Sequence, residues 1–110
     1  MENDDAVIEV VPVPEDRRFE IRVDGVRAGH AEYVRKGGLV IFTHTEIDPA
    51  FEGRGLGSKL ARGALDAVRA EGAPIVPLCP FVAGYIEKHP EYDDLVDHEC
   101  LDFLERRAAG

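Results

Sequence analysis

Glu52-Gly53-Arg54-Gly55-Leu56-Gly57 places three glycines immediately before the strongest helical pattern of the chain. From Leu56 onward, Leu60, Ala64 and Val68 recur every four residues, with charged residues on the opposite side, and Gly72 ends the pattern. Glycines let the backbone turn tightly and approach a ligand, while a helix start offers unpaired N–H groups and the positive end of its dipole. The loop therefore predicts either a site for an anion, most naturally a pyrophosphate, or a turn whose glycines serve the fold alone.

Upstream of this loop, the pattern predicts an antiparallel hairpin. Arg18–Val23 alternates charged and apolar residues, which is typical of a half-buried strand. Asp24-Gly25 suits a tight turn, and residues 26–35 form the returning strand. The apolar phase of that strand changes in its first half, so we expect a bulge near Gly29.

Two further strands complete the amino-terminal half. Residues 6–11 are mostly β-branched and precede Pro12 and Pro14, which predicts a short strand at the sheet edge because proline cannot donate to a ladder. After the turn at residues 36–38, the apolar beginning of Leu39–Ile47 indicates a central strand.

Downstream of the main helix, residues 75–78 predict a buried strand parallel to Leu39–Ile47, because a helix connects the two. A second helix is expected over residues 80–89, since proline suits a first helical position, and a short helix over residues 99–107. The sequence thus predicts an α+β fold in which helices pack on a mixed, mostly antiparallel sheet. We expect one domain over residues 1–110, with a core over about 6–96 and a helical tail over 97–110.

The charge balance excludes some partners. Thirteen basic and 22 acidic residues give a net charge of −9, which repels nucleic acid and anionic membranes. No apolar run approaches the roughly 20 residues that span a bilayer. Residues 1–5 are acidic and polar, unlike a secretory signal, so we expect a cytoplasmic protein with reduced thiols. No metal site is expected, because Cys79, His89, His98 and Cys100 lack close paired spacing.

The glycine loop resembles the signature of the GNAT N-acyltransferase superfamily. A dinucleotide-binding fold would open with a strand-helix-strand unit, whereas here three antiparallel strands come first, and no Gly-Lys-Ser or Gly-Lys-Thr suggests a P-loop. The superfamily signature is Gln or Arg, two free positions, Gly, one free position, and then Gly or Ala. Gly55 and Gly57 match it, whereas Glu52 replaces the Gln or Arg.

More narrowly, the chain is similar to the compact, stand-alone GNAT-like proteins over about residues 6–96. The similarity lies in His44-Thr45-Glu46-Ile47, in Pro77-Leu78-Cys79-Pro80-Phe81-Val82 and in His89-Pro90-Glu91-Tyr92. It implies the acyl-CoA N-acyltransferase fold, acetyl-CoA as co-substrate, and a pantetheine arm between the central strand and the parallel one. The residues expected around the coenzyme are Ile47, Glu52, Gly53, Arg54, Gly55, Leu56, Gly57, Ser58, Phe81, Tyr85, Lys88 and His89.

Acyl transfer to an amine needs a neutral amine, an oxyanion stabiliser and a proton for the leaving thiolate. Many superfamily members use a tyrosine as that acid, but Ile86 stands at the corresponding position, and Tyr85 is its neighbour. Cys79 is expected at a strand-to-helix junction, where the dipole favours a thiolate, so it is a candidate acid or nucleophile, or simply a packing residue. His44 and Glu46 share a strand face and are candidates for a proton relay, or for ordinary hydrogen-bonded surface residues.

The resemblance implies a transferase that moves an acetyl group from acetyl-CoA to a primary amine. Typical GNAT domains have two helices between their first two strands, where this chain has only about residues 12–17. The acceptor side is therefore expected to be open, which suits a small molecule or a polypeptide. The alternative is a non-catalytic module that binds acyl-CoA or docks a partner. A cysteine hydrolase has only Cys79 in its favour.

Overall fold

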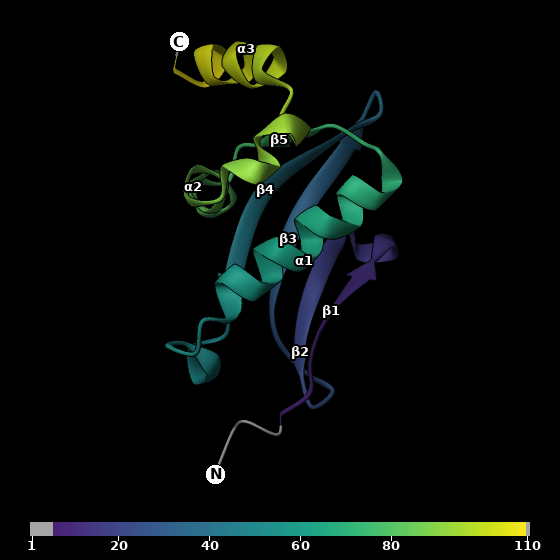
Figure 1. Cartoon of the computed structure of the whole chain (residues 1–110), viewed down its shortest axis with the longest axis vertical. Helices are drawn as coiled ribbons and strands as arrows, with labels where there is room; N and C mark the ends of the chain where they lie inside the picture. Colours follow the sequence, from purple (N-terminus) through teal and green to yellow (C-terminus); the bar gives the residue numbers. More distant parts are fainter. Residues whose placement is uncertain (1–5, 110) are drawn as a thin grey trace.

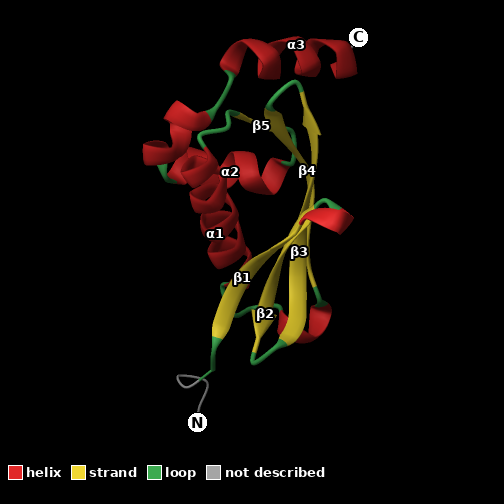
Figure 2. Cartoon of the chain, turned by 90° about the vertical axis from the view of Figure 1, so that its right-hand side faces the viewer, coloured by secondary structure: helices red, strands yellow, loops and turns green. Residues whose placement is uncertain are grey.

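The computed structural model describes residues 6–109 and contains a five-stranded sheet in the order β1-β2-β3-β4-β5 (Figure 1). Neighbouring strands are antiparallel except β4 and β5, which are parallel. Figure 2 shows α1 and α2 on the same side of the sheet. The predicted α+β fold, with helices on a mostly antiparallel sheet, is confirmed. The strands are β1 (Ile8–Val13), β2 (Arg18–Val23), β3 (Val26–Lys36), β4 (Leu39–Ile47) and β5 (Ile75–Pro77), and the helices are α1 (Leu56–Glu71), α2 (Pro80–Lys88) and α3 (His98–Ala109).

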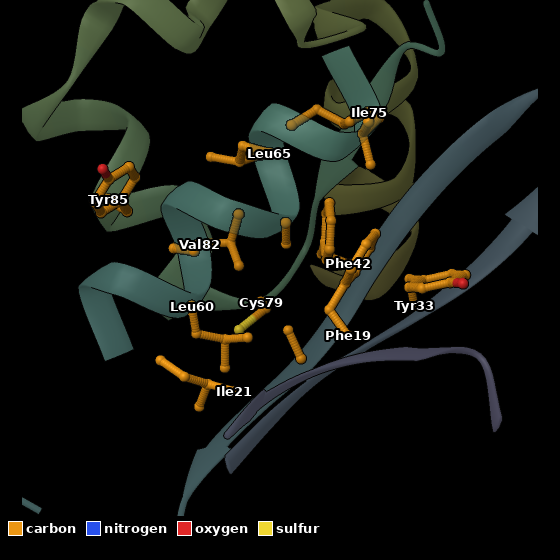
Figure 3. Packing of buried hydrophobic residues seen from close by; sticks show 14 of the residues in the cluster. Phe19, Ile21, Tyr33, Phe42, Leu60, Leu65, Ile75, Cys79, Val82 and Tyr85 are labelled. Atoms are coloured by element: carbon orange, nitrogen blue, oxygen red, sulfur yellow. The ribbon is translucent and has the colours of Figure 1, made fainter. Parts of the chain in front are cut away.

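The core lies between α1 and the sheet (Figure 3). Helix α1 buries Leu60 and Val68 completely against β1 to β4, as the four-residue spacing predicts, and it also buries Leu65. From the sheet, the rings of Phe19 and Phe42 meet at 6.3 Å between centroids. Burying side chains of this size contributes roughly 1.5–3 kcal/mol each, so this interface is the main source of stability.

The predicted bulge in β3 is present. Ile21 pairs with Gly29, but the next residue of β2, Arg22, pairs with Arg27, so Ala28 is the extra residue. Gly29 is required beside it, because a Cβ atom there would lie 2.6 Å from the carbonyl oxygen of Glu46. This bulge explains why the apolar residues of β3 change their alternation in the first half of the strand.

A second bulge, in β4, has no counterpart in the prediction. Glu32 pairs with His44 and Tyr33 pairs with Phe42, which leaves Thr43 as the extra residue. Because side chains alternate along a strand, one extra residue exchanges the two faces of the strand beyond it. Phe42 is therefore followed on the helix-covered side by Thr45 rather than by His44.

Some predicted boundaries were wrong. The first strand is Ile8–Val13 rather than residues 6–11, because Pro12 is accommodated on an edge strand, where it pairs with Phe19. Strand β5 ends at Pro77 rather than at residue 78. Helix α3 is longer than residues 99–107, and α2 ends one residue early, at Lys88. Three 3₁₀ turns, Pro14–Asp16, Pro49–Phe51 and Pro90–Leu95, were not predicted.

Tyr92 ties the segment after α2 to α1. Its side chain is buried, and its hydroxyl donates a hydrogen bond of 2.6 Å to Oδ1 of Asp66. The guanidinium of Arg69 lies 5.4 Å from the Tyr92 ring centroid and binds the carboxylate of Asp94. Burial, together with the bond to Asp66, raises the pKa of Tyr92 to about 12.

This raised pKa predicts a loss of stability in alkali. An unfolded tyrosine ionises at about pH 10, so between about pH 10 and 12 the unfolded chain releases a proton that the folded chain retains. The stabilisation is complete below about pH 10 and decreases as the pH rises toward 12, by on the order of 2–3 kcal/mol. Urea unfolding at about pH 9 and about pH 11 measures it. Tyr92→Phe should lose less stability between these pH values than the parent, and equal losses would contradict the assignment.

Candidate functional site

Two adjacent hollows lie along α1, α2 and the end of β4, and we call them together the α1–α2 groove. The larger part has a volume of 360 Å³ and the smaller part a volume of 190 Å³. Both parts are bordered by Ser58 and Phe81, so these two residues lie where the parts are adjacent. The walls consist of Thr45, Ile47, Phe51, Glu52, Gly53, Gly55, Leu56, Gly57, Ser58, Pro80, Phe81, Gly84, Tyr85, Lys88 and His89.

The start of α1 supplies hydrogen-bond donors to this groove. Gly55 is the N-cap residue in the left-handed conformation, with φ of 72°, and no side chain caps the helix. Lys59 donates to the carbonyl of Gly55, so the three amides before it, at residues 56–58, have no partner within the helix. The first turn contains no acidic residue. Unpaired amides at the positive end of a sixteen-residue helix fit a diphosphate.

Gly57 keeps the groove wall tightly packed. A Cβ atom at this position would lie 2.7 Å from Cζ of Phe81. Because Phe81 is 42% exposed, its ring forms a wall of the groove rather than part of the core. The absence of a side chain at residue 57 therefore brings α1 and α2 close together at the place where the two parts of the groove meet.

The charges around the groove are mixed. Glu52 borders it and opposes a phosphate, in contrast to the Gln or Arg of the superfamily signature. Lys88 lies at the other end and is the cation on the wall. Arg54 does not border the groove, because its guanidinium lies over the ring of Phe51, 5.5 Å from the centroid. Backbone amides, rather than side-chain cations, are thus the main donors for an anion.

Strands β4 and β5 separate beside the groove. Their pairing ends at Phe42 and Pro77, and the carbonyl of Phe42 then accepts the N–H groups of both Leu78 and Cys79, each at 3.0 Å. Helix α2 begins at Pro80 and turns away. Within residues 6–109, no strand pairs with this edge of β4 beyond Phe42, so its backbone groups are available to an amide-containing ligand such as pantetheine.

Cys79 is a buried thiol directly behind the groove wall. Its side chain is only 3% exposed and belongs to the core cluster, beside Leu60 in Figure 3. Its Sγ donates a hydrogen bond of 3.3 Å to Oγ1 of Thr45, which borders the groove. The structure places Cys79 at the start of α2, as the sequence predicts, but with the Thr45 hydroxyl between the thiol and the ligand space.

His44 and Glu46 lie on the opposite face of the sheet from the groove. They share this face, as alternation predicts, and Nε2 of His44 is 3.6 Å from Oε1 of Glu46. Both side chains are exposed, and neither borders the groove. Nε2 of His30 lies 3.0 Å from Glu32 and 3.8 Å from Glu46. The bulge at Thr43 is the reason that Thr45 and Ile47, rather than His44 and Glu46, reach the groove.

Helix α2 offers one tyrosine to the groove. Tyr85 borders it, and its ring stacks on the ring of His89 at 4.2 Å between centroids. Ile86 is buried and faces a different hollow, between α2 and α3. Burial raises the pKa of Tyr85 above its ordinary value.

The residues predicted to contact the coenzyme, except Arg54, border one or both parts of the α1–α2 groove. Thr45, Phe51, Pro80 and Gly84 also border it and were not predicted. Thr45 is two positions before Ile47, so strand alternation carried a signal for it, whereas the ring of Phe51 is brought in by an unpredicted turn. Within residues 6–109, no three His, Cys, Asp or Glu residues are arranged to hold a metal ion. No helix there is long and apolar enough to cross a membrane.

Comparisons with known proteins agree with this geometry. Residues 18–95 match the family described as GCN5-related N-acetyl-transferase. The chain is 34% identical over 77 residues to Protein NATD1 of Mus musculus, covering 67% of this chain and 69% of that protein. It is also 34% identical over 77 residues to Protein NATD1 of Homo sapiens, covering 67% of each. With Protein NATD1 of Danio rerio it shares 31% identity over 87 residues, or 74% of this chain and 78% of that one.

The two glycines that flank α1 provide a matched test of the groove. Gly55 and Gly72 have φ of 72° and 76°, and a Cβ at either meets nothing within 4 Å. Gly55→Ala and Gly72→Ala should each cost about 1 kcal/mol of stability through backbone strain. Only Gly55→Ala should weaken CoA binding, by about tenfold or more, because Gly55 borders the groove beside the unpaired amides at which the diphosphate is expected. Calorimetric titration measures both affinities, and equal affinities would place the phosphates elsewhere.

Proposed function

Because the chain belongs to the GCN5-related N-acetyltransferase family, we propose that it transfers an acetyl group from acetyl-CoA to a primary amine. The observation that carries this proposal is the course of the α1–α2 groove. It connects the unpaired amides of α1 with the edge of β4 that has no strand partner, so one elongated ligand reaches both.

Each part of the groove has a role in holding the coenzyme. The amides of residues 56–58 would bind the diphosphate, and the edge of β4 near Ile47 would pair with the amides of pantetheine. Phe81 packs against the arm, while Tyr85 and His89 form the wall at the other end. Acetyl-CoA supplies the thioester as a substrate, and its reactive end would lie where β4 and β5 separate, near Cys79.

In the proposed reaction, Thr45 and Cys79 deliver the proton that the leaving thiolate needs. When the amine attacks the thioester carbonyl, a tetrahedral oxyanion forms, and its collapse breaks the C–S bond and releases a thiolate. Thr45 donates its proton to that thiolate and takes one from Cys79 through their 3.3 Å hydrogen bond. The proton lost by the attacking amine reprotonates Cys79 through solvent. The burial of Cys79 behind Thr45 favours this acid role over direct attack by sulfur.

The acceptor amine would approach from the face of the sheet opposite to α1 and α2. His44 and Glu46 lie there, next to the bulge at Thr43 and to the point where the strands separate. The imidazole of His44 would remove the proton of the ammonium group, and the adjacent Glu46 would stabilise the resulting imidazolium. The proposed acceptor is a primary amine on a small molecule or on a polypeptide.

A non-catalytic role is the second candidate, and one observation favours it. Ile86 is buried away from the groove, so the chain has no tyrosine at the position where many superfamily members carry their acid. In that case, the protein binds acyl-CoA, or docks a partner when acyl-CoA is bound, without turnover.

Substitution of Cys79 separates the two candidates. Release of free CoA thiol from acetyl-CoA is followed with a panel of primary amines, and CoA affinity is measured in parallel. Cys79→Ala should lower kcat by roughly a hundredfold, with unchanged affinity, because it removes a proton donor that does not touch the bound coenzyme. Cys79→Ser, which keeps a hydroxyl in place of the thiol, should retain more activity. Binding without turnover in the parent protein would establish the non-catalytic alternative.

His44 is tested by the pH dependence of turnover. His44→Gln should remove a histidine ionisation from the profile of kcat/KM against pH and leave the KM for acetyl-CoA unchanged, since residue 44 faces away from the groove. His98→Gln is the matched control, because His98 is also exposed and lies 3.2 Å from a carboxylate, that of Asp93, but is on α3. If both variants keep the parent profile, another group accepts the proton.

A further inference from the structure

Helix α3 is the outermost element of the molecule. Figures 1 and 2 show it beyond one end of the sheet, while the loop before α1 lies toward the other end. Its start is fixed to the body, because Asp97 donates its N–H to the carbonyl of Ile75 and caps the N–H of Cys100 with its carboxylate. Leu101 and Leu104 are half-buried, which sets the inner face of the helix. The direction of α3 is therefore defined, and its outer face has no cover among residues 6–109.

The outer face of α3 carries three exposed residues at regular spacing. Glu99, Phe103 and Arg107 are four residues apart, so they lie along one side of the helix. Phe103 is 56% exposed, more than any other phenylalanine or tyrosine among residues 6–109. The guanidinium of Arg107 lies 5.7 Å from its ring centroid. We call these three residues the α3 stripe.

The α3 stripe is complementary to itself when one copy is reversed. Glu99 lies four residues before Phe103, and Arg107 lies four residues after it. Two copies related by a twofold axis at Phe103 would therefore place each Glu99 opposite the Arg107 of the other copy. A parallel arrangement would instead place like charges together. The stripe has no net charge, whereas the chain carries −9, so this surface escapes the repulsion that opposes other contacts between two copies.

We propose that α3 is a self-association site, at which two copies of this chain pair their α3 helices antiparallel. Phe103 packs on Phe103 at the centre, and two Glu99–Arg107 ion pairs flank it. One helix pair buries less surface than a standard interface, so the dimer is weak and concentration-dependent. No residue of α3 borders the α1–α2 groove, so the groove remains open in both copies.

Sedimentation velocity of the full chain, up to roughly 1 mM, tests the proposal. Glu99→Arg and Arg107→Glu should each raise the dimer dissociation constant at least about tenfold, because each replaces two ion pairs by two like-charge contacts. An equimolar mixture of the two variants should recover the parent affinity. In the mixed dimer, the introduced arginine of one variant faces the introduced glutamate of the other, and the unaltered Glu99 and Arg107 face each other. A parallel pairing would instead leave each single variant at the parent affinity, because like charges already face each other there, and would make the mixture bind more tightly than the parent.

Glu105→Arg is the matched control. Glu105 is an exposed acid on the same helix, but it faces the hollow between α3 and α2, and its replacement changes the net charge as much as Glu99→Arg does. It should leave the dissociation constant unchanged. Circular dichroism and CoA affinity report whether each variant is folded. A monomeric parent at the highest concentration, a Glu105→Arg effect equal to that of Glu99→Arg, or a mixture without recovery would each overturn the proposal.

Discussion

The carbonyl oxygen of Phe42 accepts the N–H groups of Leu78 and Cys79, and the arrangement of the whole site depends on this shared acceptor. Because both amides converge on one oxygen, β5 cannot continue along β4 after Pro77, and the chain leaves the sheet to begin α2 at Pro80. The remainder of β4 then keeps an edge without a strand partner. Because the chain leaves the sheet after Pro77, α2 also comes to lie beside the start of α1. The shared acceptor therefore determines both the free edge of β4 and the wall of the groove that α2 forms.

The bulge at Thr43 exchanges the two faces of β4 in the part of the strand that borders the groove. Beyond it, Thr45 and Ile47 point to the groove, and His44 and Glu46 point to the other side of the sheet. One inserted residue thus gives the two halves of the proposed reaction separate surfaces, with the thioester and its proton donor on one side and the amine on the other.

Much of this fold was readable from the sequence, and the parts that were missed have physical reasons. The alternation of charged and apolar residues predicted β2, and the four-residue spacing of apolar residues predicted α1. Both elements have one apolar and one polar face, so their periodicity is visible in the sequence. The bulge beside Gly29 was visible because it shifts apolar residues, whereas the one at Thr43 is not, because residues 43–46 are all polar and no phase can be seen to change. The glycine signature located most of the groove. It did not reveal that Arg54 rests on Phe51, or that Thr45 stands before Cys79, since both contacts depend on tertiary structure.

Because α1 is bonded to the Pro90–Leu95 turn, substitutions before the end of this turn and substitutions in α3 differ in their effect on the groove. Tyr92 and Asp94 bind Asp66 and Arg69, so the carboxyl end of α2, which leads into this turn, is secured to α1 before α3 begins. The groove is complete without any residue of α3. Substitutions in the last helix can therefore change the contacts that the protein makes through α3 while they leave the walls of the α1–α2 groove unaltered.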